Sequence, residues 1–460
     1  MPPSPSHEPR PVSAVGHGNA LFTDLYELTM LQAYLAEGMQ EPAVFTLTVR
    51  RLPPRRNFLL ACGLEQVLDY LEALRFTSDD LAYLRSLGHF CDAFLVWLAA
   101  FRFTGEVRAV PEGTPVFGGE PILEVRAPLP QAQLIETFVL NQIHLQTLLA
   151  SKAARVVSAA QGRPVIDFGA RRMHGLDAAT MAARAFHIAG LAATSNVAAG
   201  QRFGLPLAGT MAHSYIQAHD REASAFEAFA QVYPDSVLLV DTYDTLEGVQ
   251  RVIALAREQG KTFRVRAIRL DSGDLGALAR DARALLDAAG LQRVEIIASG
   301  GLDETKIAAL LAEGAPIDGF GVGTAMGVSD DAPSLDIAYK LCAYAGRGRL
   351  KLSPGKLVLP GPKQVFRRDA EGSAEGDTIA LQDERLPGRP LLVPVMHDGR
   401  RLAAGGETLS RIRARARDEI AALPTHLHSL KPADPPYPVA VSEVLQGFAD
   451  QTAAWVAGTL

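Results

Sequence analysis

The sequence predicts an irregular parallel α/β barrel with a split α+β accessory domain. Between Arg163 and Thr324, short apolar runs alternate with segments of helical periodicity, spaced by roughly one strand plus one helix. Seven of these runs end in a small or polar residue, at Asp167, Ser195, His213, Asp241, Asp271, Ser299 and Gly323. Because the chemistry of a barrel collects where its strands end, we expect an enzyme whose site spans seven loops.

Composition excludes several other classes of protein. The 460 residues allow a main domain and a smaller one, and 45 basic against 51 acidic residues give a net charge of −6. This charge argues against a general nucleic-acid surface but permits local phosphate pockets. Cys62, Cys91 and Cys342 form no CxxC pair, so we expect a reducing, cytoplasmic setting without disulfides or a zinc site. We also expect no membrane span and no signal peptide.

The first part of the chain predicts α+β structure outside the barrel. Residues 1–17 are proline-rich and are expected to form a disordered tail, and 18–130 to form the first part of the accessory domain. Thr23 or Asp24 can cap a helix, with Glu27 in capping-box spacing from Asp24. A strand, a basic turn, two helices and an antiparallel segment should follow, at 44–48, 50–56, 64–74, 81–101 and 105–126.

The rest of the chain predicts the barrel and a return to the accessory domain. Residues 131–345 are expected to form the catalytic barrel, entered through a long apolar helix from Gln131 to about Ala160. Residues 346–460 are expected to complete the accessory domain: short strands over 351–394 rejoin the first sheet, and an amphipathic helix over 407–423 and a terminal helix follow.

Two Gly-rich turns indicate a phosphate site. The segments VEIIASGGLDE and IDGFGVGT place buried-type strands before Ser299, Gly300, Gly301, Gly321, Gly323 and Thr324. Backbone N–H groups of such turns can bind phosphate, and glycine allows the close approach. The alternative is that each Gly-rich segment forms an ordinary βα turn without a ligand. Two such segments in consecutive βα units make this alternative less favoured.

Two aspartates follow the preceding apolar strands, Asp241 in VLLVDTYD and Asp271 in IRLDSGD. Carboxylates in this place can bind the hydroxyls of a sugar or a hard cation such as Mg²⁺. A single aspartate there is more often a helix cap. The pair, on neighbouring strands beside a phosphate turn, favours a functional role.

A dense cluster in VIDFGARRMHG places Phe168 and Arg171 just after a strand. An aromatic face and a guanidinium together suit a flat, anionic ring. The alternative is a core phenylalanine with solvated arginines. His213, in LAGTMAHSYIQAH, could serve as an acid, a base or a phosphoryl acceptor, although any single histidine is more often structural.

A basic set lies in the Gly/Pro-rich segment near the end of the barrel: Lys340, Lys351, Lys356, Lys363 and Arg367. Charge alone leaves two interpretations open, a solvated face or a clamp on a polyphosphate.

Together these residues resemble the nicotinate phosphoribosyltransferase family. The motifs that carry the resemblance are TDLYELTM from Thr23, DFGARR from Asp167, GTMAHSYIQAH from Gly209, DTYDT from Asp241, RLDSGDL from Arg269, ASGGLDE from Ala298, GVGT from Gly321 and KLSPGKLVLPGPKQVFR from Lys351. The resemblance implies a type II phosphoribosyltransferase, a transferase and ligase that works as a homodimer with shared active sites. It implies formation of nicotinate mononucleotide and pyrophosphate from nicotinate and phosphoribosyl pyrophosphate, with Mg²⁺, in NAD salvage.

The same resemblance implies roles for individual residues. Asp24 and Tyr26 would reach the ring pocket of the neighbouring subunit, where Phe168 stacks on nicotinate and Arg171 or Arg269 faces its carboxylate. The Gly-rich turns would hold the 5′-phosphate, and Asp241 and Asp271 the ribose hydroxyls or Mg²⁺. His213 matches the phosphorylatable histidine through which ATP hydrolysis drives transfer. The residues placed near the pyrophosphate would be Arg51, Arg56, Lys340, Lys356 and Lys363.

Three rivals remain to be weighed. A nicotinamide phosphoribosyltransferase carries an acidic residue where this chain has Ser195, so the absence of a repelling carboxylate favours the acid substrate. A quinolinate phosphoribosyltransferase would have no counterpart of the His213 segment. A non-catalytic nucleotide-binding barrel would bind ligands without releasing pyrophosphate, and His213, Asp241, Asp271 and Lys356 together argue against it.

Overall fold

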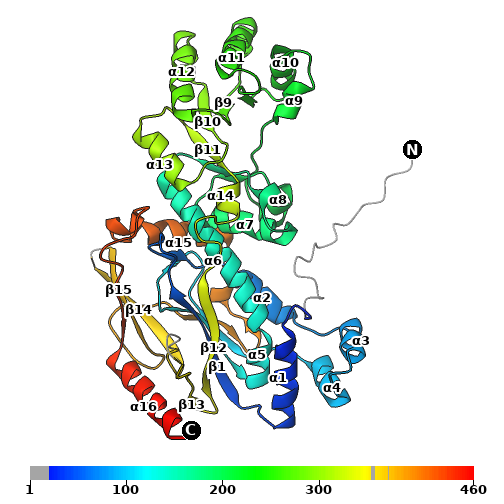
Figure 1. Cartoon of the computed structure of the whole chain (residues 1–460), viewed down its shortest axis with the longest axis vertical. Coiled ribbons are helices and arrows are strands. Elements are labelled where there is room, and N and C mark those ends of the chain that lie inside the picture. Colours follow the sequence, from blue (N-terminus) through cyan, green and yellow to red (C-terminus); the bar gives the residue numbers. More distant parts are fainter. Residues whose placement is uncertain (1–19, 354–357, 371, 460) are drawn as a thin grey trace.

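Figure 1 shows the computed structural model, which describes residues 20–353, 358–370 and 372–459. The expected disordered tail and Lys356 lie outside these residues. The chain has two large hydrophobic cores, one beneath the parallel sheet and one in the accessory part. The long helix α6 (Glu136–Ala159) contributes residues to both cores and runs between them.

The catalytic sheet is parallel, six-stranded and curled. Its order is β7-β6-β11-β10-β9-β8, with bounds β6 (Val165–Asp167), β7 (Ala193–Thr194), β8 (Val237–Leu239), β9 (Ala267–Leu270), β10 (Glu295–Ala298) and β11 (Gly319–Val322). Every neighbouring pair is parallel, and within the described residues the sheet stays open between β7 and β8. The predicted irregular α/β barrel is therefore confirmed as a half-barrel.

The expected strand before His213 is almost lost. Leu207 makes a single parallel bridge to Thr194, and His213 instead begins the short helix α9 (His213–Gln217). Pro206 has no N–H to donate and Gly209 weakens an extended segment, so the ladder does not propagate. The prediction of a full strand at this point was wrong.

Helices flank the catalytic sheet, and side chains cap several of them. Asn196, Asp244, Asp274 and Asp303 each accept a hydrogen bond from a backbone N–H in the first turn of the following helix. The helices are α7 (Leu176–Ala189), α8 (Val197–Phe203), α10 (Glu222–Val232), α11 (Thr245–Gln259), α12 (Leu275–Ala288), α13 (Glu304–Ala312) and α14 (Thr324–Gly327), with short 3₁₀ turns η1 (Ala170–Arg172) and η2 (Gly260–Thr262).

The accessory part contains a seven-stranded antiparallel sheet built from both ends of the chain. Its order is β13 (Arg347–Gly348), β12 (Asp336–Tyr344), β1 (Pro42–Arg51), β5 (Pro121–Pro128), β3 (Glu106–Ala109), β17 (Val393–His397) and β18 (Arg400–Arg401). The accessory sheet is thus split along the sequence, as predicted. Strand β12 lies within 131–345 but pairs with β1, so the last residues expected in the barrel belong to this sheet instead.

A second accessory sheet corrects another expectation. Most of 351–394 does not rejoin the first sheet, because β14 (Lys363–Ala370), β15 (Ser373–Leu381) and β16 (Arg389–Pro390) pair with one another and with β19 (Val439–Val441). Among the described strands that begin within 351–394, β17 is the one that returns to the first sheet. A two-stranded ladder joins β2 (Leu59–Leu60) to β4 (Pro115–Val116).

Helices of the accessory part largely follow the sequence pattern. They are α1 (Leu25–Ala36), α2 (Leu64–Ala73), α3 (Ser78–Ser86), α4 (Asp92–Ala100), α5 (Leu129–Leu134), α15 (Leu409–Ala421) and α16 (Glu443–Thr459), with 3₁₀ turns η3 (Ala403–Gly405) and η4 (Thr425–His428). The single helix expected over 81–101 is interrupted, with Gly88 in the left-handed region at φ 69°. None of the described helices combines the length and apolar character needed to cross a bilayer.

The expected capping box at α1 does not form. Asp24 is the N-cap residue, but its carboxylate accepts a hydrogen bond from Thr137 Oγ1 at 2.8 Å rather than from its own helix. Glu27 is buried and accepts from Gln133 Nε2 at 2.7 Å. Tertiary partners on α5 and α6 therefore take both carboxylates away from the local cap.

Candidate active site

The carboxyl ends of the parallel strands bring most of the predicted site residues to one edge. We call this edge the mouth and define it by Phe168, His213, Asp241, Arg269, Asp271, Ser299, Gly300 and Gly321. Strand β6 ends beside β11 and β7, and β10 pairs with β9, so the loops that follow these strands are neighbours. Parallel pairing therefore converts a series of sequence motifs into one site.

Two aspartates form the polar floor of the mouth. Asp271 Oδ1 accepts a hydrogen bond from Ser299 Oγ at 2.5 Å. Asp241 Oδ2 accepts from the backbone N–H of Asp271 at 2.9 Å and from Ser272 Oγ at 2.6 Å, while Asp241 Oδ1 is buried without a partner among the described residues. The carboxylates are held in place, and one buried oxygen is left to accept a ligand.

His213 faces these carboxylates from the start of α9. Its Nε2 lies 3.9 Å from Asp271 Oδ2, and its Nδ1 lies 3.1 Å from Thr242 Oγ1. The side chain is about two-fifths exposed, at 39%. Contacts at both nitrogens fix the ring plane and leave it open to the mouth.

An aromatic ring and a guanidinium lie together at the other side of the mouth. The Cζ of Arg269 is 5.8 Å from the centroid of the Phe168 ring. Nη1 of Arg269 donates to Thr210 Oγ1 at 2.5 Å and Nη2 to the carbonyl of Met211 at 3.2 Å, while its Nε is buried without a partner among the described residues. This arrangement suits a flat ring that carries an anionic group.

Arg171 lies close enough to influence Arg269. Burial lowers the pKa of Arg269 below its ordinary value, and the positive charge of Arg171 acts in the same direction, although Asp271 and Asp241 oppose it. Arg171 itself is exposed in the turn η1. Of the two candidate arginines, Arg269 is therefore partly buried beside Phe168, and Arg171 is exposed in the loop that follows Phe168.

Asp167 braces the loop that carries Phe168 and Arg171. Its carboxylate is buried, and it accepts hydrogen bonds from the backbone N–H of Gly169 and from Thr194 Oγ1, both at 2.7 Å. Burial raises the pKa of Asp167, although these two hydrogen bonds oppose the shift. Both oxygens are used within the protein, so this strand-end aspartate has a structural task.

Glycine is required at two points of the mouth. Gly300 has φ 89°, and a Cβ there would collide with the carbonyl oxygen of Asp271. A Cβ on Gly321 would overlap the ring of Phe168. These glycines let the phosphate turn and the aromatic ring pack directly against neighbouring backbone.

The remaining predicted residues of the barrel border the same edge. Ser195 directly follows β7, is exposed and donates its backbone N–H to the carbonyl of Asp167 at 2.9 Å. Gly301 follows Gly300, and Gly323 and Thr324 form the turn into α14.

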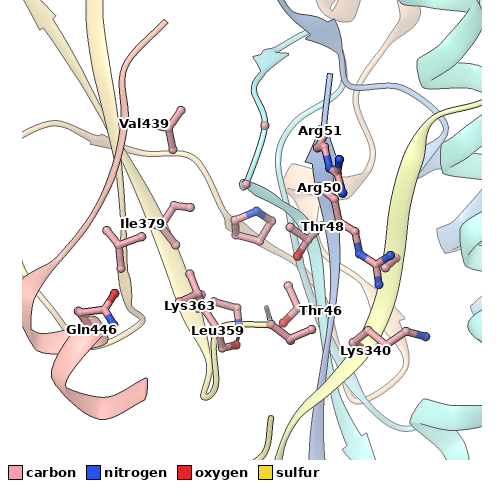
Figure 2. Close-up of a pocket in the computed structure, with 16 residues that line it drawn as sticks. Thr46, Thr48, Arg50, Arg51, Lys340, Leu359, Lys363, Ile379, Val439 and Gln446 are labelled. Atoms are coloured by element: carbon pink, nitrogen blue, oxygen red, sulfur yellow. Dashed lines mark hydrogen bonds between the residues drawn. The ribbon is translucent and has the colours of Figure 1, made fainter. Parts of the chain in front are cut away.

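The predicted basic residues of the accessory part lie elsewhere. We call their site the accessory cleft, a hollow of about 360 Å³ between the seven-stranded sheet and the β14–β15 sheet. Figure 2 shows Arg50, Arg51 and Lys340 on one wall and apolar side chains with Gln446 on the opposite wall. Figure 1 shows β1 and β12, which carry these cations, far along the molecule from β9 and β10. A single chain therefore separates the mouth from the cleft.

The cations of this region differ in availability. Arg51 is largely exposed, at 79%, and lies 3.6 Å from Asp336; Lys340 lies 3.3 Å from Glu136 Oε1. Lys363 is buried and donates to the carbonyls of Leu359 and Gly361 at 3.1 and 2.5 Å. Lys363 therefore borders the cleft with its ammonium already occupied by its own loop.

Two arginines that were grouped with this set are buried in ion pairs. Arg56 donates to Asp331, to Ser329 Oγ at 2.5 Å and to the carbonyl of Leu148 at 2.8 Å. Arg367 is paired with Asp377 at 2.6 Å. Both guanidinium groups are therefore held in buried ion pairs within the protein, although Nη1 of Arg367 has no hydrogen-bond partner among the described residues.

Asp24 and Tyr26 lie at the start of α1, also in the accessory part. Tyr26 is half-exposed, and Phe22 and Leu25 beside it are exposed to a similar extent. In the described residues no hydrogen bond or ion pair connects this end of α1 with the mouth of the same chain.

Comparisons with known proteins assign the family. Residues 21–144 match the nicotinate phosphoribosyltransferase N-terminal domain, and residues 164–345 match the nicotinate phosphoribosyltransferase family. The chain belongs to the nicotinate phosphoribosyltransferase family. The family predicted from the motifs is thus confirmed.

Other members of the nicotinate phosphoribosyltransferase family match most of the chain. A nicotinate phosphoribosyltransferase of Mycobacterium tuberculosis is 59% identical over 431 residues, covering 94% of this chain and 93% of its own. The Bacillus subtilis nicotinate phosphoribosyltransferase is 44% identical over 377 residues, covering 80% and 77%. The crystal structure of human nicotinic acid phosphoribosyltransferase superposes with a TM-score of 0.84 at 30% identity, covering 93% and 99%.

Sequence reasoning missed several polar side chains that orient the family motifs. Thr242 holds His213, Thr210 holds Arg269 and Ser272 holds Asp241. Each lies within the quoted motifs or directly beside a singled-out residue, so adjacency was an available signal. Their hydroxyls satisfy the groups that carry the chemistry.

A metal ion would need ligands from the substrate at this site. In the described parts of the chain, no three His, Cys, Asp or Glu side chains are grouped to hold a metal. Mg²⁺ commonly takes one or two carboxylates and completes its shell with water and phosphate oxygens. Asp241, with its unpartnered Oδ1, and Asp271 fit that pattern.

Proposed function

We propose that this chain transfers the phosphoribosyl group of phosphoribosyl pyrophosphate to the ring nitrogen of nicotinate, forming nicotinate mononucleotide and pyrophosphate in NAD salvage. The observation that carries the proposal is the convergence of three features at the mouth. These are an aromatic ring beside a guanidinium, a pair of anchored carboxylates, and a glycine turn that cannot tolerate a side chain.

Nicotinate would stack on Phe168 with its carboxylate directed at Arg269 or Arg171. The two hydrogen bonds that hold Arg269 keep the guanidinium beside the ring before the substrate arrives. Its buried Nε still has a proton to donate. A preorganised, partly desolvated cation is well suited to a carboxylate, because little reorganisation is needed on binding.

The sugar phosphate would bind across the remaining width of the mouth. Ser299, Gly300 and Gly301 precede α13, and Gly321 and Gly323 precede Thr324, the first residue of α14, so these two turns would offer backbone N–H groups to the 5′-phosphate. Asp241 and Asp271 would address the ribose hydroxyls or hold Mg²⁺. A bound Mg²⁺ would neutralise charge on the pyrophosphate.

Catalysis would depend on position and charge. The bond from ribose C1′ to the pyrophosphate oxygen breaks, pyrophosphate keeps the electron pair, and C1′ bonds to the lone pair of the pyridine nitrogen. Because C1′ gains positive character during this exchange, the fixed carboxylate of Asp271 would stabilise it electrostatically. No proton needs to move at the ring nitrogen, so the transfer itself requires no general base there.

We further propose that His213 accepts a phosphoryl group from ATP and so couples ATP hydrolysis to transfer. Thr242 occupies Nδ1, which leaves Nε2 facing the anionic floor of the mouth. A phosphate on that nitrogen would add negative charge beside Asp271 and change the affinity for substrate and product.

We also propose a cytoplasmic homodimer with shared active sites. In a single chain the accessory cleft and the exposed Tyr26 lie away from the mouth. A second copy could bring its Tyr26, Arg51 and Lys340 to this mouth and complete the ring and pyrophosphate pockets.

A pyrophosphate-release assay tests the reaction. Purified chain with nicotinate, phosphoribosyl pyrophosphate and Mg²⁺ should release pyrophosphate, and ATP should increase the rate. Ligand binding without pyrophosphate release would instead indicate a non-catalytic barrel. His213→Ala should abolish the increase due to ATP and retain some ATP-independent transfer; unchanged ATP dependence would show that another residue is phosphorylated.

Nicotinamide is the alternative substrate. Exposed Ser195 adds no negative charge next to the Phe168 loop, and the two arginines favour an anion. We therefore expect nicotinate to be used far better than nicotinamide. Equal turnover of the two would remove the argument from Ser195.

A further inference from the structure

One buried lysine connects the helices that follow the two phosphate turns. Lys152 lies on α6, and its Nζ is 2.7 Å from Glu304 Oε2, 2.9 Å from Asp330 Oδ1 and 2.9 Å from Asp331 Oδ1. Glu304 is the first residue of α13, four residues after Gly300, and Asp330 and Asp331 follow α14. A single ammonium therefore contacts acidic groups attached to both halves of the phosphate site.

Burial of the Lys152 ammonium costs free energy, which indicates that its ion pairs have a specific structural role. Lys152 is 1% exposed, and a desolvated ammonium is unfavourable unless carboxylates compensate it. Burial alone would lower its pKa, but the Glu304 carboxylate and the contacts to Asp330 and Asp331 raise it, so the lysine stays charged. In sequence, Lys152 stands in the helix segment LLASKAARVV, in which Ser151 and Arg155 are the other polar residues, and a leucine or methionine would fill its space without this cost.

The neighbouring cations make Lys152 a link rather than a sole counter-ion. Arg155 Nε donates to Glu304 Oε1 at 3.0 Å, and Arg56 donates to Asp331. Each buried carboxylate thus keeps a partner if Lys152 is removed. Among the described residues, Lys152 is the side chain that contacts both Glu304 at the start of α13 and the acidic pair that follows α14. Its removal would therefore take away this direct link, while Arg155 and Arg56 keep their own ion pairs with Glu304 and Asp331.

We propose that Lys152 is a positioning residue that fixes the two phosphate turns relative to each other. Resting on the proposed function above, this inference assigns Lys152 a role in binding the 5′-phosphate of phosphoribosyl pyrophosphate without touching it. The turns at Gly300 and Gly323 must place their N–H groups around one phosphate, and α6 supplies the rigid reference to which both are attached. Nicotinate binding uses Phe168 and Arg269, which take no part in this ion cluster, so we expect it to depend much less on the link.

Lys152→Met tests the inference through the two Michaelis constants. We expect KM for phosphoribosyl pyrophosphate to rise about 10-fold, since a small misplacement of a binding turn is costly, while KM for nicotinate changes less than about 2-fold. Lys152→Arg should recover part of the loss. The matched control is Arg184→Met, which removes another fully buried cation, located on α7, from an ion cluster with Glu112 and Glu65. It should lower the melting temperature without separating the two constants.

Asp330→Asn decides the question if Lys152→Met does not fold. The side chain of Asp330 is about half-exposed, at 49%, and its substitution changes only one of the three ion pairs of Lys152. The variant should therefore have the melting temperature of the wild type. We expect KM for phosphoribosyl pyrophosphate to rise about 3-fold, a smaller misplacement of the same turn.

Two results would overturn the role of Lys152. One is an unchanged KM for phosphoribosyl pyrophosphate in Asp330→Asn or in folded Lys152→Met. The other is the same separation of constants in Arg184→Met. Both are measured against an active wild-type enzyme, whereas a wild type that releases no pyrophosphate would instead contradict the proposed function.

Discussion

The residues of the mouth and the cations of the accessory cleft were both predicted to bind substrate, but the two sets differ in what determines their position and in how available their side chains are. Mouth residues follow parallel strands, and the register of that sheet brings Phe168, Asp241, Asp271 and Gly300 together within one chain. Cleft residues come from β1, β12 and β14, which are distant in sequence, and several of their charges are already neutralised. Local pattern therefore predicts the mouth well and the cleft poorly.

The reason lies in what decides each position. The end of a parallel strand is encoded by a short apolar run and the residue after it. The availability of a cation is decided by the carboxylates and carbonyls that long-range folding brings near it. The sequence suggested that Lys363 and Arg56 were available to bind a ligand. In the folded chain, Lys363 donates a hydrogen bond to the carbonyl of Gly361, and Arg56 forms an ion pair with Asp331.

The largest expected effect breaks the mouth at its phosphate turn. Gly300→Ala introduces a Cβ against the carbonyl oxygen of Asp271 at a residue with φ 89°. We expect the loop to be destabilised by about 2–4 kcal/mol and the activity to fall at least about 100-fold. Circular dichroism melting and pyrophosphate release measure the two effects.

Gly209→Ala is the matched control for that substitution. Gly209 lies in the segment before His213, and a Cβ there would meet no atom within 4 Å. The control should retain the stability and most of the activity of the wild type. Near-normal activity of Gly300→Ala would mean that the turn is free to move and does not define the phosphate site.

The prediction of intermediate size concerns the ring pocket of the mouth. Ser195→Asp adds a carboxylate next to the Phe168 loop, where like-charge repulsion should lower kcat/KM for nicotinate about 10- to 100-fold. Because Ser195 is exposed, the fold should tolerate the change. Ser195→Asn introduces a side chain of the same size as aspartate but without its charge, and it should have a much smaller effect. Equal losses in the two variants would contradict an electrostatic role for this position.

Two predictions about local structure were wrong for different reasons. The capping box at Asp24 and Glu27 is correct in spacing, but Thr137 and Gln133 take both carboxylates. The strand before His213 is correct in place, but Pro206 limits it to one bridge. In the first case tertiary partners decided the outcome, whereas in the second the proline was visible in the sequence and the apolar pattern was given more weight than its missing N–H.

The smallest expected effect concerns the accessory part. Burial, with the charges of Glu136 and Asp24, raises the pKa of Glu27 from 4.5 to about 7, against the hydrogen bonds from Gln133 and Tyr26. The folded chain therefore keeps this proton to higher pH than the unfolded chain does. The resulting stabilisation, on the order of 1–3 kcal/mol, is complete below pH 4.5 and is lost as pH rises through about 7.

Glu27→Gln should remove this pH dependence. The variant keeps an acceptor for Gln133 and has no proton to lose, so the decrease in melting temperature between pH 4.5 and 7 should become shallower. Glu37→Gln, an exposed site at the end of the same helix, should leave the wild-type slope unchanged. An unaltered slope in Glu27→Gln would assign the pH dependence to other groups.

Subunit mixing tests most directly whether the mouth and the cleft are two halves of one active site. Asp271→Asn inactivates the mouth, and the double variant Tyr26→Ala/Arg51→Ala, at two exposed positions, inactivates the accessory half. If sites are shared, equal amounts exchanged into heterodimers should recover about a quarter of wild-type activity, because half of the dimers then contain one intact site of two. Activity that remains at the average of the two separate variants would show that each chain holds its whole site and would contradict the account.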